Sequence, residues 1–128
     1  MPTPPQTLPR QPRSRELGSS LNLAGQLYWD PEVLTMEMDR LFSNDWLCVG
    51  RSEDLGRSGD FLTLEVGADP ILVLRGDDGE VRAFYNACRH RGTRLMERRQ
   101  GSDLGNISCP YHGWTYNGRG ELIAARRW

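Results

Sequence analysis

Two histidines that each follow a cysteine closely are the residues of this sequence best suited to chemistry. The 128 residues contain three Cys and two His, and both His lie in short mixed segments, C-R-H from Cys88 and C-P-Y-H from Cys109. Thiolates and imidazoles bind transition metals well, and a spacing of two or three residues lets one turn aim both side chains at the same point. The sequence therefore predicts a metal centre with four ligands: Cys88, His90, Cys109 and His112.

The distribution of the ligands over two segments indicates which metal they hold. A structural zinc site with two Cys and two His usually pairs Cys with Cys on one loop and His with His on a helix. Here each segment supplies one of each. Such mixed pairs are typical of a 2Fe-2S cluster in which two thiolates bind one iron and two imidazoles bind the other, an arrangement that favours uptake of an electron. An electron-transfer centre is the favoured interpretation, and a zinc-bound structural or interaction module is the alternative.

Short β-strands are the elements expected to position these ligands. Runs of β-forming residues separated by Gly and Asp predict strands at 46–50, 60–66, 71–74, 81–85, 106–108, 114–116 and 121–124. Two segments, Asp77-Asp78-Gly79 and Asn117-Gly118, supply residues that tolerate a positive φ at hairpin turns. We expect a mainly β fold of antiparallel strands, with the two Cys-His segments as loops.

One amphipathic helix is expected before the strands. Asp30 is a typical N-cap, Pro31 suits the first helical position, and the helix should end near residues 43–44. Its apolar face would carry Leu34, Met38, Leu41 and Phe42. Residues 1–20 are rich in Pro, Gln, Ser and Arg, which predicts a disordered tail, so that a single domain would span 21–128.

Composition excludes several classes of function. The formal net charge is −1, which argues against nucleic-acid binding, and no apolar run approaches the ~20 residues of a membrane-spanning helix. An odd, low Cys count without a signal peptide predicts a reducing, cytoplasmic location and no disulfide framework. Cys48 lies in an apolar segment and is expected to be a buried, inert thiol.

The segment NACRHRGTRL (86–95), followed by CPYHGWTYNGRGEL (109–122), resembles the N-terminal Rieske domain of ring-hydroxylating oxygenase α subunits, the Rieske non-haem iron oxygenases. The resemblance extends over residues 28 to 125 and includes the helical segment WDPEVLTMEMDRLFSNDWLCVGR. It implies a small Rieske-type β-sandwich with one N-terminal helix. It also implies a Rieske 2Fe-2S cluster on the four residues named above.

The same resemblance implies the place of the cluster in a reaction. In this family the cluster accepts electrons from a ferredoxin or a flavoprotein reductase and passes them to a mononuclear Fe(II) that activates O2 for hydroxylation. That iron belongs to a C-terminal domain, and only sixteen residues without His follow His112, so we expect no catalytic residue in this chain. Full-length members form homo-oligomers, commonly trimers, in which His112 would be the electron exit. A stand-alone Rieske ferredoxin-like carrier is the alternative, against which the N-terminal helical segment argues.

Residues beside the ligands have expected supporting roles. Gly92 and Gly113 follow the ligands and should allow tight turns, while the aromatic residues Tyr111, Trp114 and Tyr116 should shield the cluster from water. The first segment is basic, which suits docking of an acidic electron donor or, alternatively, a solvated surface. High-potential Rieske proteins carry an extra Cys in each loop and a Ser after the His-Gly pair. Their absence here implies a low potential of roughly −150 mV.

Overall fold

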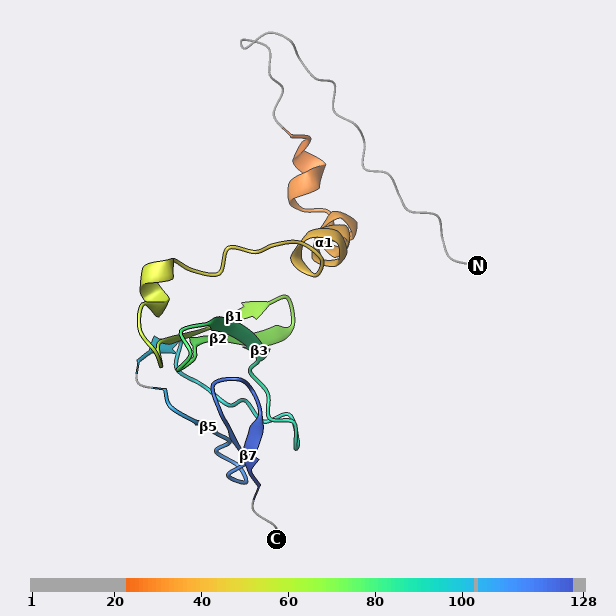
Figure 1. The fold of residues 1–128 in the computed structure, drawn as a ribbon. Coiled ribbons are helices and arrows are strands. Elements are labelled where there is room, and N and C mark those ends of the chain that lie inside the picture. The colour runs from red at the N-terminus through yellow and green to blue at the C-terminus, as the bar shows by residue number, and fades with distance from the viewer. Residues whose placement is uncertain (1–22, 103, 126–128) are drawn as a thin grey trace.

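A computed structural model describes residues 23–102 and 104–125, and most of their regular structure is antiparallel β (Figure 1). The predicted disordered tail at 1–20 lies outside the described residues. Within the described part of the chain, no helix combines the length and apolar character needed to cross a membrane. The mainly β fold class with one helix is confirmed.

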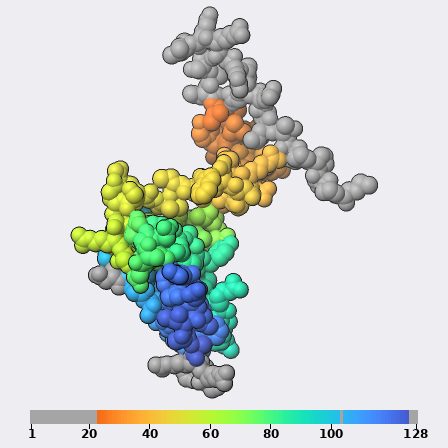
Figure 2. Space-filling view, in the orientation of Figure 1, coloured from red at the N-terminus to blue at the C-terminus, as the bar shows by residue number. Residues whose placement is uncertain are grey.

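The predicted helix forms and is capped as expected. It consists of α1 (Pro31–Glu37) continued by one π-helical turn, η2 (Met38–Phe42), and a 3-10 turn, η1 (Gly25–Tyr28), precedes it. The Asp30 carboxylate accepts a hydrogen bond from the Glu32 N–H at 2.9 Å, which satisfies one free donor of the first turn. No residue of these helices is buried, and the helical segment projects from the sheets in Figure 2.

Four strands form the first sheet in the order β3-β2-β1-β4. They are β1 (Phe61–Val66), β2 (Asp69–Arg75), β3 (Val81–Tyr85) and β4 (Gln100–Gly101). A 3-10 turn, η3 (Ser52–Leu55), leads into β1. The register places Phe61 opposite Leu74 and Leu72 opposite Phe84. Because side chains alternate between the two faces of a strand, Leu72 and Leu74 point to the same side, and both are buried there.

Three short strands form the second sheet in the order β5-β6-β7, and it lies beyond β3 in Figure 1. They are β5 (Ile107–Ser108), β6 (Thr115–Tyr116) and β7 (Leu122–Ala124). The two sheets contribute to one buried cluster of seven residues: Phe61, Leu72, Leu74, Cys88, Ile107, Cys109 and Tyr116. The two ligand cysteines are thus part of the core itself.

Two expectations for the segment before β1 are wrong. The sequence predicts a strand over residues 46–50, but they adopt no regular secondary structure and pair with no described strand. Strand-forming residues need a neighbouring strand to satisfy their backbone hydrogen bonds, and local sequence does not supply one. Since this segment is uncovered, Trp46 is 98% exposed, and Cys48 is exposed rather than buried.

The two predicted hairpin turns form, with one change of residue. In the β2–β3 turn, Gly79 has a φ of 80°, as expected. In the β6–β7 turn, the residue with positive φ is Gly120, also at 80°, instead of Gly118. The side chain of Asp78 joins these turns, because it forms ion pairs with Arg82 of β3 (2.8 Å) and with Arg119 of the second turn (3.4 Å).

Candidate metal centre

Two loops with the same backbone conformation carry the four predicted ligands. In loop 1 (88–93), the Cys88 N–H donates to the carbonyl five residues later (2.8 Å), and the Gly92 N–H donates back to the Cys88 carbonyl (2.8 Å). Loop 2 (109–114) repeats both bonds, at 2.7 Å from Cys109 and 3.0 Å from Gly113. Gly92 and Gly113 have φ values of 70° and 69°, which a residue with a Cβ rarely adopts. The expected turn role of both glycines is confirmed.

The structure brings the two predicted cysteine ligands into contact with each other and the two predicted histidine ligands into contact with each other, with the cysteines inside and the histidines nearer the surface. Cys88 and Cys109 are 3% and 4% exposed, and the two thiols lie within hydrogen-bonding reach of each other. The rings of His90 and His112 meet edge to face, with 4.8 Å between their centroids. A sulfur pair and a nitrogen pair therefore occupy two depths of one site.

The buried imidazole nitrogens fit a metal ligand better than a hydrogen-bonding role. His90 Nδ1 is buried and has no hydrogen-bond partner in the described part of the chain, and His112 Nδ1 is buried as well. A buried nitrogen without a partner costs free energy, which coordination to a metal would recover. Among the described residues, no three His, Cys, Asp or Glu side chains gather for one ion. Two ligands for each of two irons need no such group of three.

Local electrostatics favours the protonation states that bind metals. Burial raises the pKa of the Cys88 thiol, but hydrogen bonds from the Tyr116 hydroxyl (3.3 Å) and the His90 N–H outweigh it, so its pKa is lowered. Burial lowers the pKa of His112, and electrostatic interactions with His90 and Arg91 lower it further. A thiolate and a neutral imidazole are the forms that coordinate a metal. The direction of both pKa shifts is therefore compatible with metal binding.

Aromatic side chains cover the ligands unequally. Trp114 stacks on the His90 ring at 4.8 Å between centroids with an interplanar angle of 9°, and Tyr116 is 6% exposed beside Cys88. Tyr111 lies 3.7 Å from the His112 ring but is itself 59% exposed. Trp114 and Tyr116 therefore shield the site, whereas Tyr111 forms part of its outer surface.

Part of the positive charge predicted for the first segment is engaged within the protein. Arg94 forms an ion pair with Glu65 of β1 at 2.7 Å, and the Arg98 guanidinium lies 5.3 Å from the centre of the Phe61 ring. Arg89 and Arg91 are exposed and flank His90. Exposed positive charge therefore remains in this segment, including two arginines beside the histidine of loop 1.

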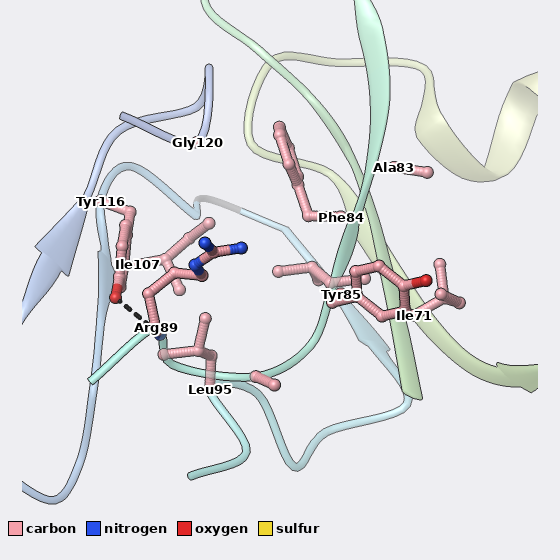
Figure 3. A pocket seen from close by; sticks show the side chains of 11 residues that line it. Ile71, Ala83, Phe84, Tyr85, Arg89, Leu95, Ile107, Tyr116 and Gly120 are labelled. Carbon is pink, nitrogen blue, oxygen red and sulfur yellow. Dashed lines mark hydrogen bonds between the residues drawn. The ribbon is translucent and has the colours of Figure 1, made fainter. Parts of the chain in front are cut away.

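A cavity of about 410 Å³ lies behind loop 1, between β3 and the second sheet. Figure 3 shows the Arg89 side chain extending between the rings of Tyr116 and Phe84, and the hydrogen bond from the Arg89 N–H to the Tyr116 hydroxyl (3.1 Å). The four predicted ligands do not line this cavity. Tyr116 separates the cavity from Cys88 and contacts both.

Asn86 is a residue of the site that sequence reasoning missed. It lies two residues before Cys88, is completely buried, and makes two side-chain hydrogen bonds to the backbone of Met96. An amide directly after a β-forming run was the available signal, because a polar side chain at such a position needs specific partners if it is buried.

The fold and the site define a class of protein, and a family model identifies it. Residues 45–127 match the model of the Rieske [2Fe-2S] domain, and the chain belongs to this family. The match contains both ligand loops and both sheets, so the cofactor of the class is a Rieske 2Fe-2S cluster.

The chain is similar to oxygenase subunits of two reaction types. It is 42% identical to the glycine betaine monooxygenase oxygenase subunit of Chromohalobacter salexigens over 81% of this chain and 23% of that protein. It is 38% identical to the biphenyl 2,3-dioxygenase subunit alpha of Rhodococcus jostii over 77% of this chain and 21% of that protein. The chain thus spans about a quarter of the length of these relatives.

Solved structures share the fold at similar identity. The quaternary ammonium Rieske monooxygenase CntA with L-carnitine superimposes with a TM-score of 0.75 and 36% identity, over 80% of this chain and 29% of that one. Naphthalene 1,2-dioxygenase from Rhodococcus sp. gives a TM-score of 0.72 and 34% identity, over 78% and 22%. The resemblance to oxygenase α subunits is confirmed, and these relatives are oxidoreductases.

Proposed function

We propose that this chain is the electron-transfer part of an oxygenase α subunit, with Cys88 and Cys109 binding one iron of the cluster and His90 and His112 binding the other. The observation that carries this assignment is the meeting of a buried thiol pair with a histidine pair in a Rieske domain. When bound, the cluster takes up and releases one electron at a time. The protein's residues hold it, exclude water from its sulfur side and leave its histidine side accessible.

The relatives' names support the electron-transfer role in particular. One relative is named as a subunit of a monooxygenase and another as a subunit of a dioxygenase, and both are similar to this Rieske domain. A step common to both reactions is delivery of electrons, so this is the step that we assign to the domain. The mononuclear Fe(II) and the substrate site would belong to the remaining part of an α subunit, and the chain alone would not hydroxylate.

A ferredoxin or a flavoprotein reductase is the proposed electron donor, and the exposed cations Arg89 and Arg91 support an acidic one. In a homo-oligomer, such as the trimer expected for full-length members, His112 would pass the electron onward to the iron of the neighbouring subunit. The names of the relatives as subunits support a multi-subunit assembly in general. We also propose a cytoplasmic location, which three free cysteines support.

The stand-alone carrier is the less supported alternative. The alignment with a glycine betaine monooxygenase oxygenase subunit of Pseudomonas aeruginosa covers 113 residues, or 88% of this chain. This stretch is longer than the family segment 45–127, so it includes residues of the N-terminal helical segment. A segment shared with oxygenase subunits outside the cluster domain favours the oxygenase assignment.

Ligand assignment can be tested by spectroscopy of two matched cysteine variants. After anaerobic reconstitution and reduction with dithionite, the chain should give the low-average-g paramagnetic signal of a Rieske cluster. Cys109→Ser should abolish this signal, whereas Cys48→Ser should retain it, because Cys48 is exposed and outside the site. A colourless wild-type protein, or a signal that survives in Cys109→Ser, contradicts the proposal.

Electron acceptance can be tested separately with a reduced plant-type ferredoxin as the probe. Its potential of about −400 mV lies well below the roughly −150 mV expected here, so transfer to this cluster is downhill. Mixing should produce the reduced Rieske signal, at a rate that falls as salt is added. A cluster that dithionite reduces but ferredoxin does not would contradict the proposed donor class.

A further inference from the structure

We propose that Asn86 is a positioning residue that holds loop 1 in the conformation presenting Cys88 and His90, a role that rests on the proposed function of these ligands. Asn86 follows β3 and has 0% of its surface exposed. The largest fully buried side chains in the described part of the chain are those of Phe61, Leu72, Leu74 and Asn86, and of these only Asn86 is polar. A buried amide is costly unless its hydrogen bonds are made, so its partners indicate its purpose.

Loop 1 is preceded by residues 86–87, the outgoing arm, and followed by residues 94–96, the returning arm. Both the Nδ2 and the Oδ1 of the Asn86 amide bind Met96 on the returning arm. Nδ2 donates to the Met96 carbonyl at 2.7 Å, and Oδ1 accepts from the Met96 N–H at 2.8 Å. The Asn86 backbone N–H donates to the Pro70 carbonyl of β2 at 2.7 Å. One residue therefore connects the outgoing arm, the returning arm and the first sheet.

Loop 1 depends on this side chain because its arms have little backbone pairing of their own. Apart from the bonds inside loop 1 itself, of which the Cys88 N–H to Thr93 carbonyl bond (2.8 Å) is the outermost, the described chain has between the arms one isolated bridge, Ala87 with Arg94, and a long bond of 3.4 Å from the Leu95 N–H to the Asn86 carbonyl. Loop 2 has no such need, since the paired strands β5 and β6 flank it directly. The amide of Asn86 thus replaces in loop 1 the strand pair that frames loop 2.

Loss of this connection should affect the ligands of loop 1 first. Cys88 and His90 lie two and four residues beyond Asn86, and their positions relative to Tyr116 and Trp114 are set across the gap between the two sheets. If the arms separate, the Met96 N–H and carbonyl lose their partners. The arms would then sample several arrangements in place of one.

Hydrogen exchange measured by mass spectrometry on the metal-free chain tests this role without the cluster. Asn86→Asp keeps the volume and the acceptor but loses the Nδ2 donor, whereas Asn86→Leu loses both bonds. Asn106→Asp, at an exposed Asn near loop 2, is the matched control. We expect exchange of segment 87–98 to accelerate about tenfold in Asn86→Asp and about a hundredfold in Asn86→Leu, with segment 61–75 and the control unchanged.

Cluster spectroscopy supplies the second measurement. Release of the reconstituted cluster to a chelator should accelerate in the same order, and the paramagnetic lines of Asn86→Asp should broaden because its loop geometry is heterogeneous. Equal acceleration in 61–75 and 87–98, or wild-type exchange in Asn86→Asp, would overturn the role of Asn86. The Asp variant is decisive if the Leu variant does not fold. If the wild type binds no cluster, the proposed function fails, while the exchange experiment still decides the role of Asn86.

Discussion

At the scale of single residues, the site depends on hydrogen bonds made to buried groups. The Tyr116 hydroxyl lies 3.3 Å from Cys88 Sγ and accepts a hydrogen bond from the Arg89 N–H at 3.1 Å. When Cys88 is a thiolate, the Tyr116 O–H is the donor in this contact, because a thiolate has no proton to give. Hydrogen bonds to the sulfur ligands stabilise the more negative, reduced state of an iron-sulfur cluster. We therefore expect Tyr116 to influence the reduction potential of a bound cluster.

Removing this hydroxyl should make the cluster harder to reduce. We expect Tyr116→Phe to lower the midpoint potential by roughly 60 mV, the one-electron equivalent of about 1.4 kcal/mol. A redox titration followed by the paramagnetic signal measures the shift. Tyr85→Phe is the control, because Tyr85 is 64% exposed in β3. An unchanged or raised potential in Tyr116→Phe would argue against the hydrogen bond to sulfur.

Asp60 supplies a stability that depends on pH. Hydrogen bonds from Ser102 and from the Arg57 N–H (2.7 Å), with the charges of Arg57 and Arg75, outweigh burial and hold the pKa of Asp60 below its usual range. Because the folded-state pKa is the lower one, this stabilisation is present above the ordinary value of about 3.9 and disappears as pH falls through the folded-state pKa.

The corresponding experiment compares urea unfolding of the wild type and Asp60→Asn. The variant should be less stable at pH 7, and the difference in unfolding free energy should shrink progressively below about pH 4. Asp69→Asn, at an exposed carboxyl in β2, serves as the control. A difference that stays constant from pH 7 to pH 3 would show that the Asp60 charge is not responsible.

At the scale of elements, turns with a positive φ determine how closely the two sheets approach. Gly120 in the β6–β7 turn faces the Phe84 ring of β3, and a Cβ at this position would lie 2.6 Å from a ring carbon. Gly79 has the same φ of 80°, but a Cβ there would have no neighbouring atom within 4 Å among the described residues, and Gly105 has neither constraint in that part of the chain. Comparing the three glycines therefore distinguishes the effect of backbone conformation from the effect of close packing.

The cost of an alanine substitution in unfolding free energy should increase from Gly105 to Gly79 to Gly120. We expect Gly105→Ala to change the unfolding free energy little, Gly79→Ala to cost about 1–2 kcal/mol for its φ, and Gly120→Ala to cost about 2–4 kcal/mol for φ and overlap together. Chemical denaturation measures all three. Equal costs for Gly79→Ala and Gly120→Ala would mean that the turn moves away from Phe84 without penalty.

At the scale of the whole molecule, the candidate cluster joins the two sheets. Loop 1 leaves β3 of the first sheet, and loop 2 connects β5 with β6 of the second, so ligands from both meet at one point. Their cysteines belong to the core that the sheets share. The helical segment stands apart from this unit in Figure 1 and contacts it through Met38, whose methyl lies against Gly67 in the β1–β2 turn.

Removal of the cluster should consequently weaken the entire fold. We expect thermal unfolding of the metal-free chain at a Tm more than about 10 °C lower, because about 1 kcal/mol shifts the Tm of such a domain by 4–8 °C and a structural metal contributes more than that. Circular dichroism before and after chelation measures the change. Cys48→Ser should show the same loss as the wild type. An unchanged Tm would mean that the sheets pack independently of the ligand loops.

Sequence alone identified the features that depend on neighbouring residues. The ligand spacing, the Asp30 cap, the Gly92 and Gly113 turns and the strand Val81–Tyr85 were all predicted, because each depends on local chemistry or backbone geometry. The family followed from the same residues, since a metal centre restricts both the type and the spacing of its ligands.

Only the tertiary structure decided features that depend on distant partners. Residues 46–50 have the composition of a strand but no described partner strand, and Cys48 is consequently exposed. Gly120 takes the positive φ of its turn where it meets Phe84. The buried amide of Asn86 binds Met96, ten residues further along the chain. Burial and pairing are properties of two segments in contact, so one segment's sequence does not determine them.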